Sequence, residues 1–303
     1  MWEEILELYE KLNAVDAVAP IAHTAIQADI GVLLDNTGKL IGAKGLDNEN
    51  YFVPCTEKSE YRTSGAAPHL MHDNLSYVSS MEGYEKRHKL YMEQLASYIS
   101  NVDDGLAKAV YKNAEAGTLL SDLKPIIETI RKPVDKINII FAVHGGENKS
   151  TIDRMWEKYY VSTLPVNGVC GITGEKSYIP ESYPGKIRNQ GDFAKLFQRV
   201  GKESMDSMPE IVPGYATAQK IIHTLQAFIR WESPESGITT AEMRALLGMS
   251  RPEFSKKYEI PLRTIEDWEA GKRKCPSYVT RLLMRCVTAD FKEKIYEEKG
   301  VRI

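Results

Sequence analysis

Apolar residues recur at the three- and four-residue spacing of an amphipathic helix in several parts of the chain. The N-terminal stretch 2–12 shows the pattern clearly, since Ile5, Leu8 and Leu12 fall on one helical face. Similar spacing predicts further helices over 82–99, 103–115, 119–130, 150–160, 192–200 and 215–231. Ser150 or Thr151 is the expected N-cap of the helix 150–160.

Strand patterns occur mainly in the first 55 residues. Residues 26–35 and 39–46 flank the turn sequence Asn36-Thr37-Gly38, and together they predict a β-hairpin. After a polar break, residues 51–54 predict a short separate strand that a proline ends. Residues 137–143 are rich in β-branched side chains and predict a buried strand, so we expect a small mixed sheet.

Three segments are rich in turn-forming or polar residues and are predicted to be irregular. These segments are 57–80, 168–174 and 178–190. The strongest linker pattern is Ser-Pro-Glu-Ser-Gly at 233–237. We therefore expect an α+β domain over 1–232, with an early hairpin, helices and a small mixed sheet, followed by an all-α domain over 238–303.

Composition narrows the functional class. The 303 residues are 43% hydrophobic and 27% charged, which is typical of a soluble globular protein of two domains. No apolar run approaches the roughly 20 residues needed to span a bilayer, and the acidic N-terminus does not resemble a targeting signal. The expected location is the cytoplasm. The four cysteines form no Cys-x-x-Cys pair, so reduced thiols are expected and a zinc site is not.

Charge is distributed unevenly along the chain. Residues 251–303 contain 13 Lys and Arg against 9 Asp and Glu, whereas residues 1–250 contain 26 against 33. The net charge of -3 is thus the sum of a basic C-terminal part and an acidic remainder. Any surface that binds nucleic acid must be local.

The C-terminal segment has the pattern of two short helices joined by a tight turn. Ser250 and Glu253 occupy the positions of a capping box, Glu259 begins the turn, and Gly271 ends the second helix. The expected core residues are Phe254, Tyr258, Ile265, Trp268, Val279, Leu282, Leu283 and Cys286.

This segment resembles a Cro/repressor-type (XRE-like) helix-turn-helix, whose Thr-Ile-x-x-Trp-Glu-x-Gly-x-Arg pattern is matched by residues 264–273. In that family the second helix enters the major groove of DNA. The resemblance implies DNA contacts by Arg251, Arg263, Thr264, Lys272, Arg273 and Lys274. The alternative is a helical bundle used for docking or dimerisation, and Glu266 and Asp267 on the outer face would weaken attraction to phosphate.

The segment 62–78 carries the densest group of chemically versatile side chains. His69, His72 and Asp73 could hold a metal ion or supply a base. The favoured interpretation is a polar loop whose side chains bond their own backbone, because no separate third ligand is identified. Residues 173–176 lack a complete phosphate-loop motif, and no serine-hydrolase elbow occurs. No catalytic residue, metal or cofactor is predicted.

A third polar stretch follows at 183–193. It contains two types of side chain that contact phosphates, Lys186 and Arg188. It also contains two that contact base edges, Asn189 and Gln190. An ordinary solvated loop explains the same cluster equally well.

Taken in order, these stretches resemble the large subunit of the type I-C CRISPR surveillance complex (Cascade). The Arg…Gly…Pro…Leu…Asp-Asn…Tyr-Val pattern of that family is similar to residues 62–78, and its Cys…Thr-Gly-Glu pattern is matched at 170–175. A looser match follows at 184–190, and the resemblance spans residues 1–231. It implies nucleic-acid or complex contacts by Arg62, Asn74, Lys186, Arg188, Asn189 and Gln190.

The resemblance also implies a function. The family's large subunit is not a nuclease: it grips the guide-RNA handle, reads the protospacer-adjacent motif in duplex DNA and helps to open the duplex. This sequence departs from the family in its length, about half of the usual, and in its C-terminal part. The expected partners are duplex DNA, type I-C Cascade subunits with guide RNA, and a second copy of the chain, with no membrane.

The leading hypothesis is therefore a non-enzymatic nucleic-acid-binding protein of CRISPR antiviral defence that is fused to a helix-turn-helix. One alternative is a mobile-element decoy, an anti-CRISPR that mimics the large subunit and represses its own promoter. Others are a plain transcription regulator and a metal-dependent hydrolase.

Overall fold

The computed structural model describes residues 2–14, 17–60, 62, 65–185, 187, 195–197, 212–232, 239–276, 279–280, 282–284, 286–287 and 290. It divides into two units. The sheet unit is Ala19–Pro184 with Val212–Ala216, and the terminal unit is Met1–Val18 with Gly185–Ile211 and Thr217–Ile303. The linker predicted at 233–237 lies outside the described residues, as does the helix predicted at 192–200 apart from 195–197, which are not helical.

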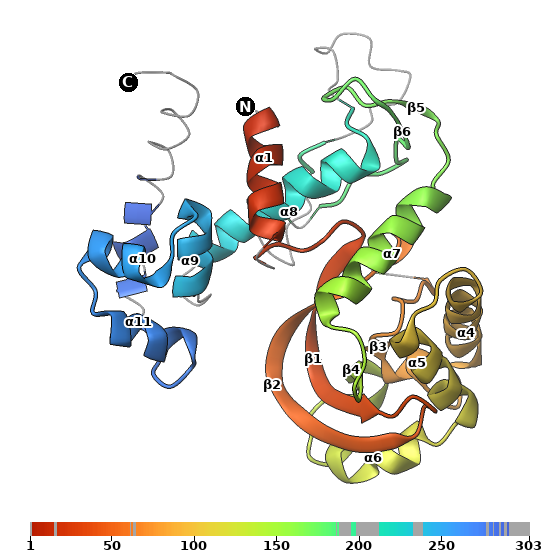
Figure 1. Cartoon of the computed structure of the whole chain (residues 1–303). Coiled ribbons are helices and arrows are strands. Elements are labelled where there is room, and N and C mark those ends of the chain that lie inside the picture. Colours follow the sequence, from red (N-terminus) through yellow and green to blue (C-terminus); the bar gives the residue numbers. More distant parts are fainter. Residues whose placement is uncertain are drawn as a thin grey trace. The chain divides into compact units, whose positions relative to one another are not determined.

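A four-stranded mixed sheet forms the centre of the sheet unit. Strands β1 (His23–Leu34) and β2 (Leu40–Pro54) form a long antiparallel hairpin, which Figure 1 shows as two curved arrows side by side. Strand β4 (Asn138–Val143) pairs parallel with β1, and β3 (Asp73–Asn74) pairs antiparallel with β4. The order β2-β1-β4-β3 confirms the predicted hairpin within a small mixed sheet.

The hairpin is longer than predicted. The expected polar break at 47–50 lies inside β2, and the separate strand expected at 51–54 is the end of the same strand. The pairing shifts between Ala28 and Ile30, whose partners are Glu49 and Gly45. A β-bulge therefore accommodates the extra residues of β2 without ending the strand.

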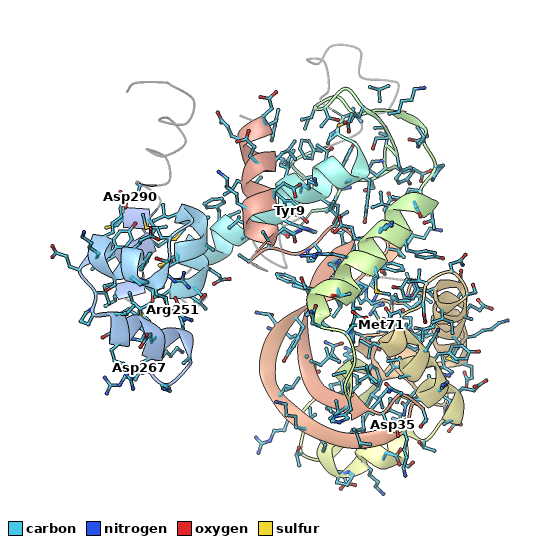
Figure 2. All side chains as sticks on the ribbon, in the orientation of Figure 1. Tyr9, Asp35, Met71, Arg251, Asp267 and Asp290 are labelled. Carbon is cyan, nitrogen blue, oxygen red and sulfur yellow. The ribbon has the colours of Figure 1, made fainter. Side chains whose placement is uncertain are left out.

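The hairpin turn packs tightly against a helix. Asp35, labelled in Figure 2, accepts hydrogen bonds from the backbone N–H groups of Thr37 (2.8 Å) and Lys39 (3.0 Å). Gly38 follows with a φ of +86°, and its carbonyl accepts a 2.9 Å hydrogen bond from Asn113. A Cβ atom at Gly38 would lie 2.7 Å from the carbonyl oxygen of Ala109, so only glycine fits here.

Four longer helices accompany the sheet in this unit. They are α4 (Glu85–Ile99), α5 (Gly105–Ala116), α6 (Leu119–Ile127) and α7 (Lys149–Thr163). Shorter elements are α2 (Glu57–Glu60), α3 (Leu75–Val78), the 3-10 helix η1 (Val134–Lys136) and the paired strands β5 (Gly168–Val169) and β6 (Lys176–Ser177).

The cap of α7 differs from the prediction. Asn148 is the N-cap, and its side chain accepts a 2.9 Å hydrogen bond from the backbone N–H of Thr151. Ser150 and Thr151, the expected caps, lie within the first turn. Asparagine caps as well as serine does, and Asn148 has the extended backbone that a cap requires.

The core of the sheet unit is centred on Trp156 of α7. Its indole N–H donates to the carbonyl oxygens of Ala22 (3.0 Å) and Cys55 (3.2 Å), which adjoin the start of β1 and the end of β2. The rings of Tyr160 and Tyr98 pack on it, with centroids at 5.2 Å and 5.5 Å. These contacts fasten the open end of the hairpin to α7.

The regular elements that the structure describes in the terminal unit are helices. It contains α1 (Trp2–Asn13), all but the first two residues of α8 (Tyr215–Glu232), α9 (Thr240–Leu247), α10 (Arg251–Tyr258) and α11 (Leu262–Glu269). Lys220 of α8 pairs with Glu10 of α1, and its ammonium lies 5.6 Å from the ring centroid of Tyr9. No helix in the described part of the chain combines the length and the apolarity that crossing a membrane requires.

The local pattern expected for α10 and α11 is confirmed. Ser250 and Glu253 form the capping box, and Glu259 has a φ of +54° in the turn. Phe254 and Ile265 are fully buried.

The expected packing of the following segment is wrong in part. Leu282 is 57% exposed and Cys286 is exposed, whereas Leu283, Met284 and Val287 are buried, so the buried face of this segment is rotated from the one predicted.

Candidate functional site

The segment 62–78, which we call the signature loop, is anchored onto β4 by its own backbone. The N–H of Leu75 donates to the carbonyl of Ile137 (2.9 Å), and Asp73 and Asn74 pair with Ile139 and Asn138. At the other end, the N–H of Leu70 donates to the carbonyl of Pro54 at the end of β2 (3.1 Å). Two strands that are far apart in the sequence thus position this loop.

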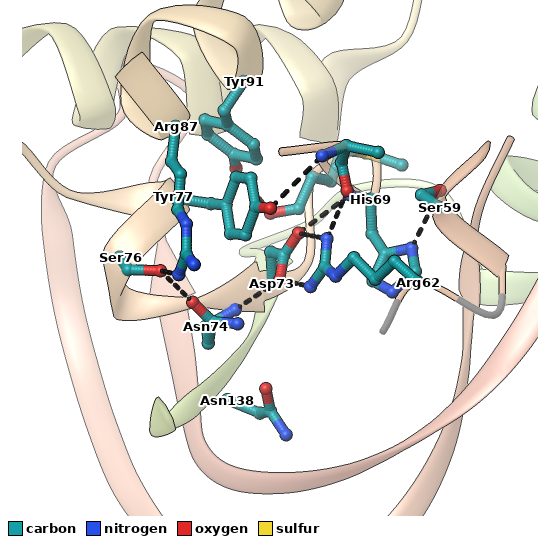
Figure 3. A network of polar contacts seen from close by, with 12 residues as sticks. Ser59, Arg62, His69, Asp73, Asn74, Ser76, Tyr77, Arg87, Tyr91 and Asn138 are labelled. Atoms are coloured by element: carbon teal, nitrogen blue, oxygen red, sulfur yellow. Dashed lines mark hydrogen bonds and ion pairs between the residues drawn. The ribbon is translucent and has the colours of Figure 1, made fainter. Parts of the chain in front are cut away.

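Asp73 is the centre of a polar network within the loop (Figure 3). Its carboxylate is 1% exposed, accepts two hydrogen bonds from the guanidinium of Arg62, and accepts others from the backbone N–H groups of His69 (2.8 Å) and Asn74 (2.7 Å). Burial lowers the pKa of Arg62, but hydrogen bonding and charge from Asp73 outweigh that effect and raise the pKa above its ordinary value. Each oxygen of the Asp73 carboxylate thus has one guanidinium donor and one backbone donor.

Tyr77 lies between two arginines. Its ring centroid is 4.5 Å from the guanidinium carbon of Arg62 and 5.4 Å from that of Arg87, which is within the range of cation–π attraction. Its hydroxyl accepts a 3.2 Å hydrogen bond from the N–H of Ala67. Arg87 also lies over the ring of Tyr84 at 5.0 Å.

The two histidines of the loop serve its packing. Nδ1 of His69 lies 3.2 Å from the hydroxyl of Ser59, and Nδ1 of His72 accepts a 3.1 Å hydrogen bond from the N–H of Phe141. Burial lowers the pKa of His69 to about 4 and that of His72 to about 3, so both rings are neutral near pH 7. These contacts support the polar-loop interpretation over a metal or base site, and the described residues contain no cluster of three metal-ligating side chains.

One side of the network is partly exposed. Asn74 and Asn138 are both half-buried, and Arg87 donates a 2.9 Å hydrogen bond to the hydroxyl of Ser76. Among the described residues Arg87 contacts this hydroxyl and two tyrosine rings, and it has no carboxylate partner. We call Asn74, Ser76, Arg87 and Asn138 the polar patch.

Arg87 and Asn138 of the polar patch are not among the residues predicted from the sequence. A signal for Arg87 was present, because residues 86–89 read Lys-Arg-His-Lys in the first turns of α4, where the helix dipole disfavours positive charge. Asn138 lies within an apolar strand pattern, and nothing in its local sequence indicates a surface site. It joins the polar patch only because it pairs with Asn74.

The site residues predicted for the N-terminal part of the chain divide into two groups. Arg62 and Asn74 belong to one network, in which Arg62 is largely enclosed and Asn74 reaches the surface. Lys186, Arg188, Asn189 and Gln190 lie outside the described residues, so their expected contacts stay predictions.

In the terminal unit, the predicted residues differ in their accessibility. The side chain of Arg263 is 78% exposed, with Asp267 at 3.6 Å, and Thr264 is half-buried. The basic residues after α11 are exposed; they are Lys272, Arg273 and Lys274. Arg251 instead pairs with Glu269 at 2.6 Å.

Glu269 joins all three short helices of this region. Its carboxylate, 4% exposed, pairs with Arg244 of α9 (2.7 Å) as well as with Arg251 of α10. Burial raises the pKa of Glu269, but hydrogen bonds and charge from the two arginines outweigh this and hold the pKa below its ordinary value. This ionised triad fixes α11 against α9 and α10.

The comparisons with known proteins identify the class. The model of a family described as CRISPR-associated protein (Cas_Csd1) matches residues 5–241, more than three quarters of the chain. The chain therefore belongs to this family of CRISPR-associated proteins. The match includes the signature loop and the polar patch and ends in α9. Among curated proteins no match is found.

Proposed function

We propose that the protein is a non-enzymatic nucleic-acid-binding component of type I-C CRISPR machinery, similar to its large subunit, and that the polar patch contacts the nucleic acid. The observation that carries this proposal is Arg87. It is held by Ser76 and flanked by Tyr77 and Tyr84, without a carboxylate partner among the described residues. A fixed, uncompensated guanidinium beside surface amides is suited to phosphate contact.

The network behind the patch favours binding over catalysis. The acid, the base candidates and the cation of the signature loop each have an internal partner, so the loop is a rigid support. Rigid support is what a hydrogen-bonding surface needs, because side chains that are already fixed lose little entropy on binding.

We further propose that α10 and α11 form a helix-turn-helix that binds duplex DNA. Arg263 and Thr264 at the start of α11 would contact bases, and Lys272, Arg273 and Lys274 would contact phosphates. The ion pairs of Arg251 with Glu269 and of Arg263 with Asp267 compete with such contacts, so we assign the larger share of DNA affinity to the three residues after α11.

A second candidate is a decoy that occupies the place of the large subunit and blocks interference. The acidic balance of residues 1–250, 33 Asp and Glu against 26 Lys and Arg, favours it, because such a surface is suited to a basic protein partner.

The test combines co-purification with binding measurements on the full chain. The chain is co-expressed with the other type I-C subunits and guide RNA, and purified on a tag carried by one of those subunits. We expect the chain to co-purify. Absence from the purified complex would count against the CRISPR role in both of its forms, and inhibition of interference by the added chain would select the decoy.

Binding of labelled duplex DNA and guide RNA is then compared between wild type and Arg87→Ala. We expect about tenfold weaker binding and a shallower salt dependence for the variant. The matched control is Lys89→Ala, which removes the same charge from the same helix at a position 78% exposed and paired with Glu93. Equal losses in both variants would refute a specific role for Arg87. Gel shifts with Lys272→Ala and Arg273→Ala test the proposed helix-turn-helix in the same way.

A further inference from the structure

A pocket lies where the turn of the β1–β2 hairpin meets the last turns of α5 and the start of α6. Its volume is about 520 Å³, and sites for small organic ligands range over about 300–1,000 Å³. All of its lining belongs to the sheet unit and none of it to the polar patch. The lining includes Lys39, Leu40, Lys112, Asn113, Ala116 and Asp122, and we call this site the turn pocket.

Hydrogen bonds between the lining residues hold the walls of the turn pocket in place. Nδ2 of Asn113 on α5 donates to the carbonyl oxygen of Gly38 in the hairpin turn (2.9 Å), which joins two of the walls. The hydroxyl of Thr118 donates to Oδ2 of Asp122 (2.7 Å), which fixes the third wall at the start of α6. A ligand that enters a preformed pocket of this kind has few side chains to immobilise.

Asn113 has a hydrogen-bond acceptor that the fold does not use. The residue is 3% exposed, and its Nδ2 faces a backbone carbonyl, which can only accept, so the positions of nitrogen and oxygen in the amide are determined. Its Oδ1 has no donor among the described residues. A buried acceptor without a donor is uncommon and costly. A donor group on a ligand in the turn pocket would satisfy it.

The turn pocket also has two cationic side chains. Lys39 and Lys112 are exposed, and among the described residues neither forms an ion pair. Nζ of Lys112 lies 3.5 Å from the carbonyl oxygen of Asn36, at the limit of a hydrogen bond. Asp122 is the single acid among the lining residues, so the lining is positively charged. An anionic group on the ligand therefore complements this part of the pocket.

We propose that the turn pocket binds a free mononucleotide. The phosphate pairs with Lys39 and Lys112, and an N–H or amino group of the base donates to Oδ1 of Asn113. Leu40 and Ala116 supply apolar surface for the base ring.

Simpler ligands complement only part of this lining. Inorganic phosphate would pair with the lysines but leave the acceptor of Asn113 without a donor. A nucleoside would supply the donor but leave both ammonium groups without an anion. A free amino acid carries an acid and an N–H donor, but it fills only a small part of 520 Å³. The inference does not depend on the function proposed for the polar patch.

The experiment is isothermal titration calorimetry of the full wild-type chain with AMP, CMP, GMP and UMP. The corresponding nucleosides, inorganic phosphate and glutamate are titrated for comparison. We expect saturable binding of at least one nucleotide at one site per chain. Inorganic phosphate, glutamate and the matching nucleoside should each bind at least about tenfold more weakly, because each lacks a charge-assisted contact or the base.

Variants place the binding in the turn pocket. Lys39→Met and Lys112→Met remove the charge but keep the length of the side chain, and each should weaken nucleotide binding about tenfold. The matched control is Lys108→Met, which makes the same exchange on α5 at a residue that pairs with Asp103 and does not line the pocket. It should leave the affinity unchanged.

Asn113→Ala removes the buried acceptor and should also weaken binding about tenfold. This substitution also removes the hydrogen bond to Gly38, so its melting temperature is measured alongside, and the two lysine variants keep the test independent of any loss of folding.

Three results would overturn the proposal. The first is the absence of saturable binding for every nucleotide. The second is inorganic phosphate or glutamate binding as tightly as the best nucleotide, which would indicate an anion site only. The third is equal nucleotide affinity in Lys112→Met and Lys108→Met, or an unchanged affinity in folded Asn113→Ala, since the ligand would then lie elsewhere.

Discussion

The carboxylate of Asp73 should be the energetic centre of the signature loop, and its removal by Asp73→Ala is the sharpest perturbation that the structure offers. The substitution leaves the guanidinium of Arg62, 18% exposed, without its counter-ion, and leaves the N–H groups of His69 and Asn74 without their acceptor. Removing one partner of a buried ion pair costs about 3–5 kcal/mol. We expect a loss of that size in the free energy of unfolding of the sheet unit.

The opposite truncation, Arg62→Ala, should cost less. The carboxylate, 1% exposed, loses its counter-ion but keeps both backbone donors, so we expect a loss at the lower end of the same range, about 3 kcal/mol. The double variant should cost less than the sum of the two single ones, because each single change already removes the same ion pair.

Native-state hydrogen exchange of the β4 amides in increasing urea isolates the stability of this unit from that of the terminal unit. The control is Asp103→Ala, which breaks the ion pair between Asp103 and Lys108. The Asp103 side chain is 93% exposed, so its removal should change the free energy of unfolding little. If Arg62→Ala proved as costly as Asp73→Ala, the backbone donors would contribute nothing and the proposed centre would be wrong.

Three further predictions concern other parts of the molecule. In the folded chain the pKa of His69 is about 4 and that of His72 is about 3, below the ordinary value of 6.5. Between these folded values and pH 6.5 the unfolded chain therefore binds more protons than the folded chain. The free energy of unfolding should fall as the pH falls below 6.5, by about 2.5 kcal/mol per pH unit near pH 5. In His72→Asn this dependence on pH should be halved, which urea titrations at several pH values would measure. Gly38→Ala should destabilise the hairpin by about 2–3 kcal/mol, because a Cβ would lie 2.7 Å from the carbonyl of Ala109 at a φ of +86°; unchanged amide protection in β1 and β2 would refute this. Glu269→Ala should cost about 2 kcal/mol, measured by hydrogen exchange of α9 and α10, whereas Glu269→Gln should retain part of that stability.

Local features of the fold followed well from the sequence. The hairpin, the capping box of Ser250 and Glu253, and the predicted amphipathic helices other than 192–200 are confirmed, because each depends on residues within a few positions of one another. The continuity of β2 through its polar segment could not be predicted locally, since pairing with β1 through a bulge overrides the weak strand propensity there.

The site was predictable only in part. Arg62 and Asn74 were correctly placed in one loop, and its polar character was recognised, but β3 is two residues long and exists only because β4 supplies its partner. The patch therefore depends on a contact between residues more than 60 positions apart, which no local pattern encodes. Asn138 became visible as a candidate only through that contact.

The pairing of the signature loop with β4 also has a consequence for synthesis. The loop ends at residue 78, while the N–H of Phe141 that holds His72 and the carbonyl of Ile137 that holds Leu75 come about 60 residues later. At 5–20 residues per second a ribosome needs roughly 3–12 s to cover that interval. Throughout that time Asp73 and His72 lack their strand, so the nascent chain should recruit chaperones and be open to proteases until β4 has emerged.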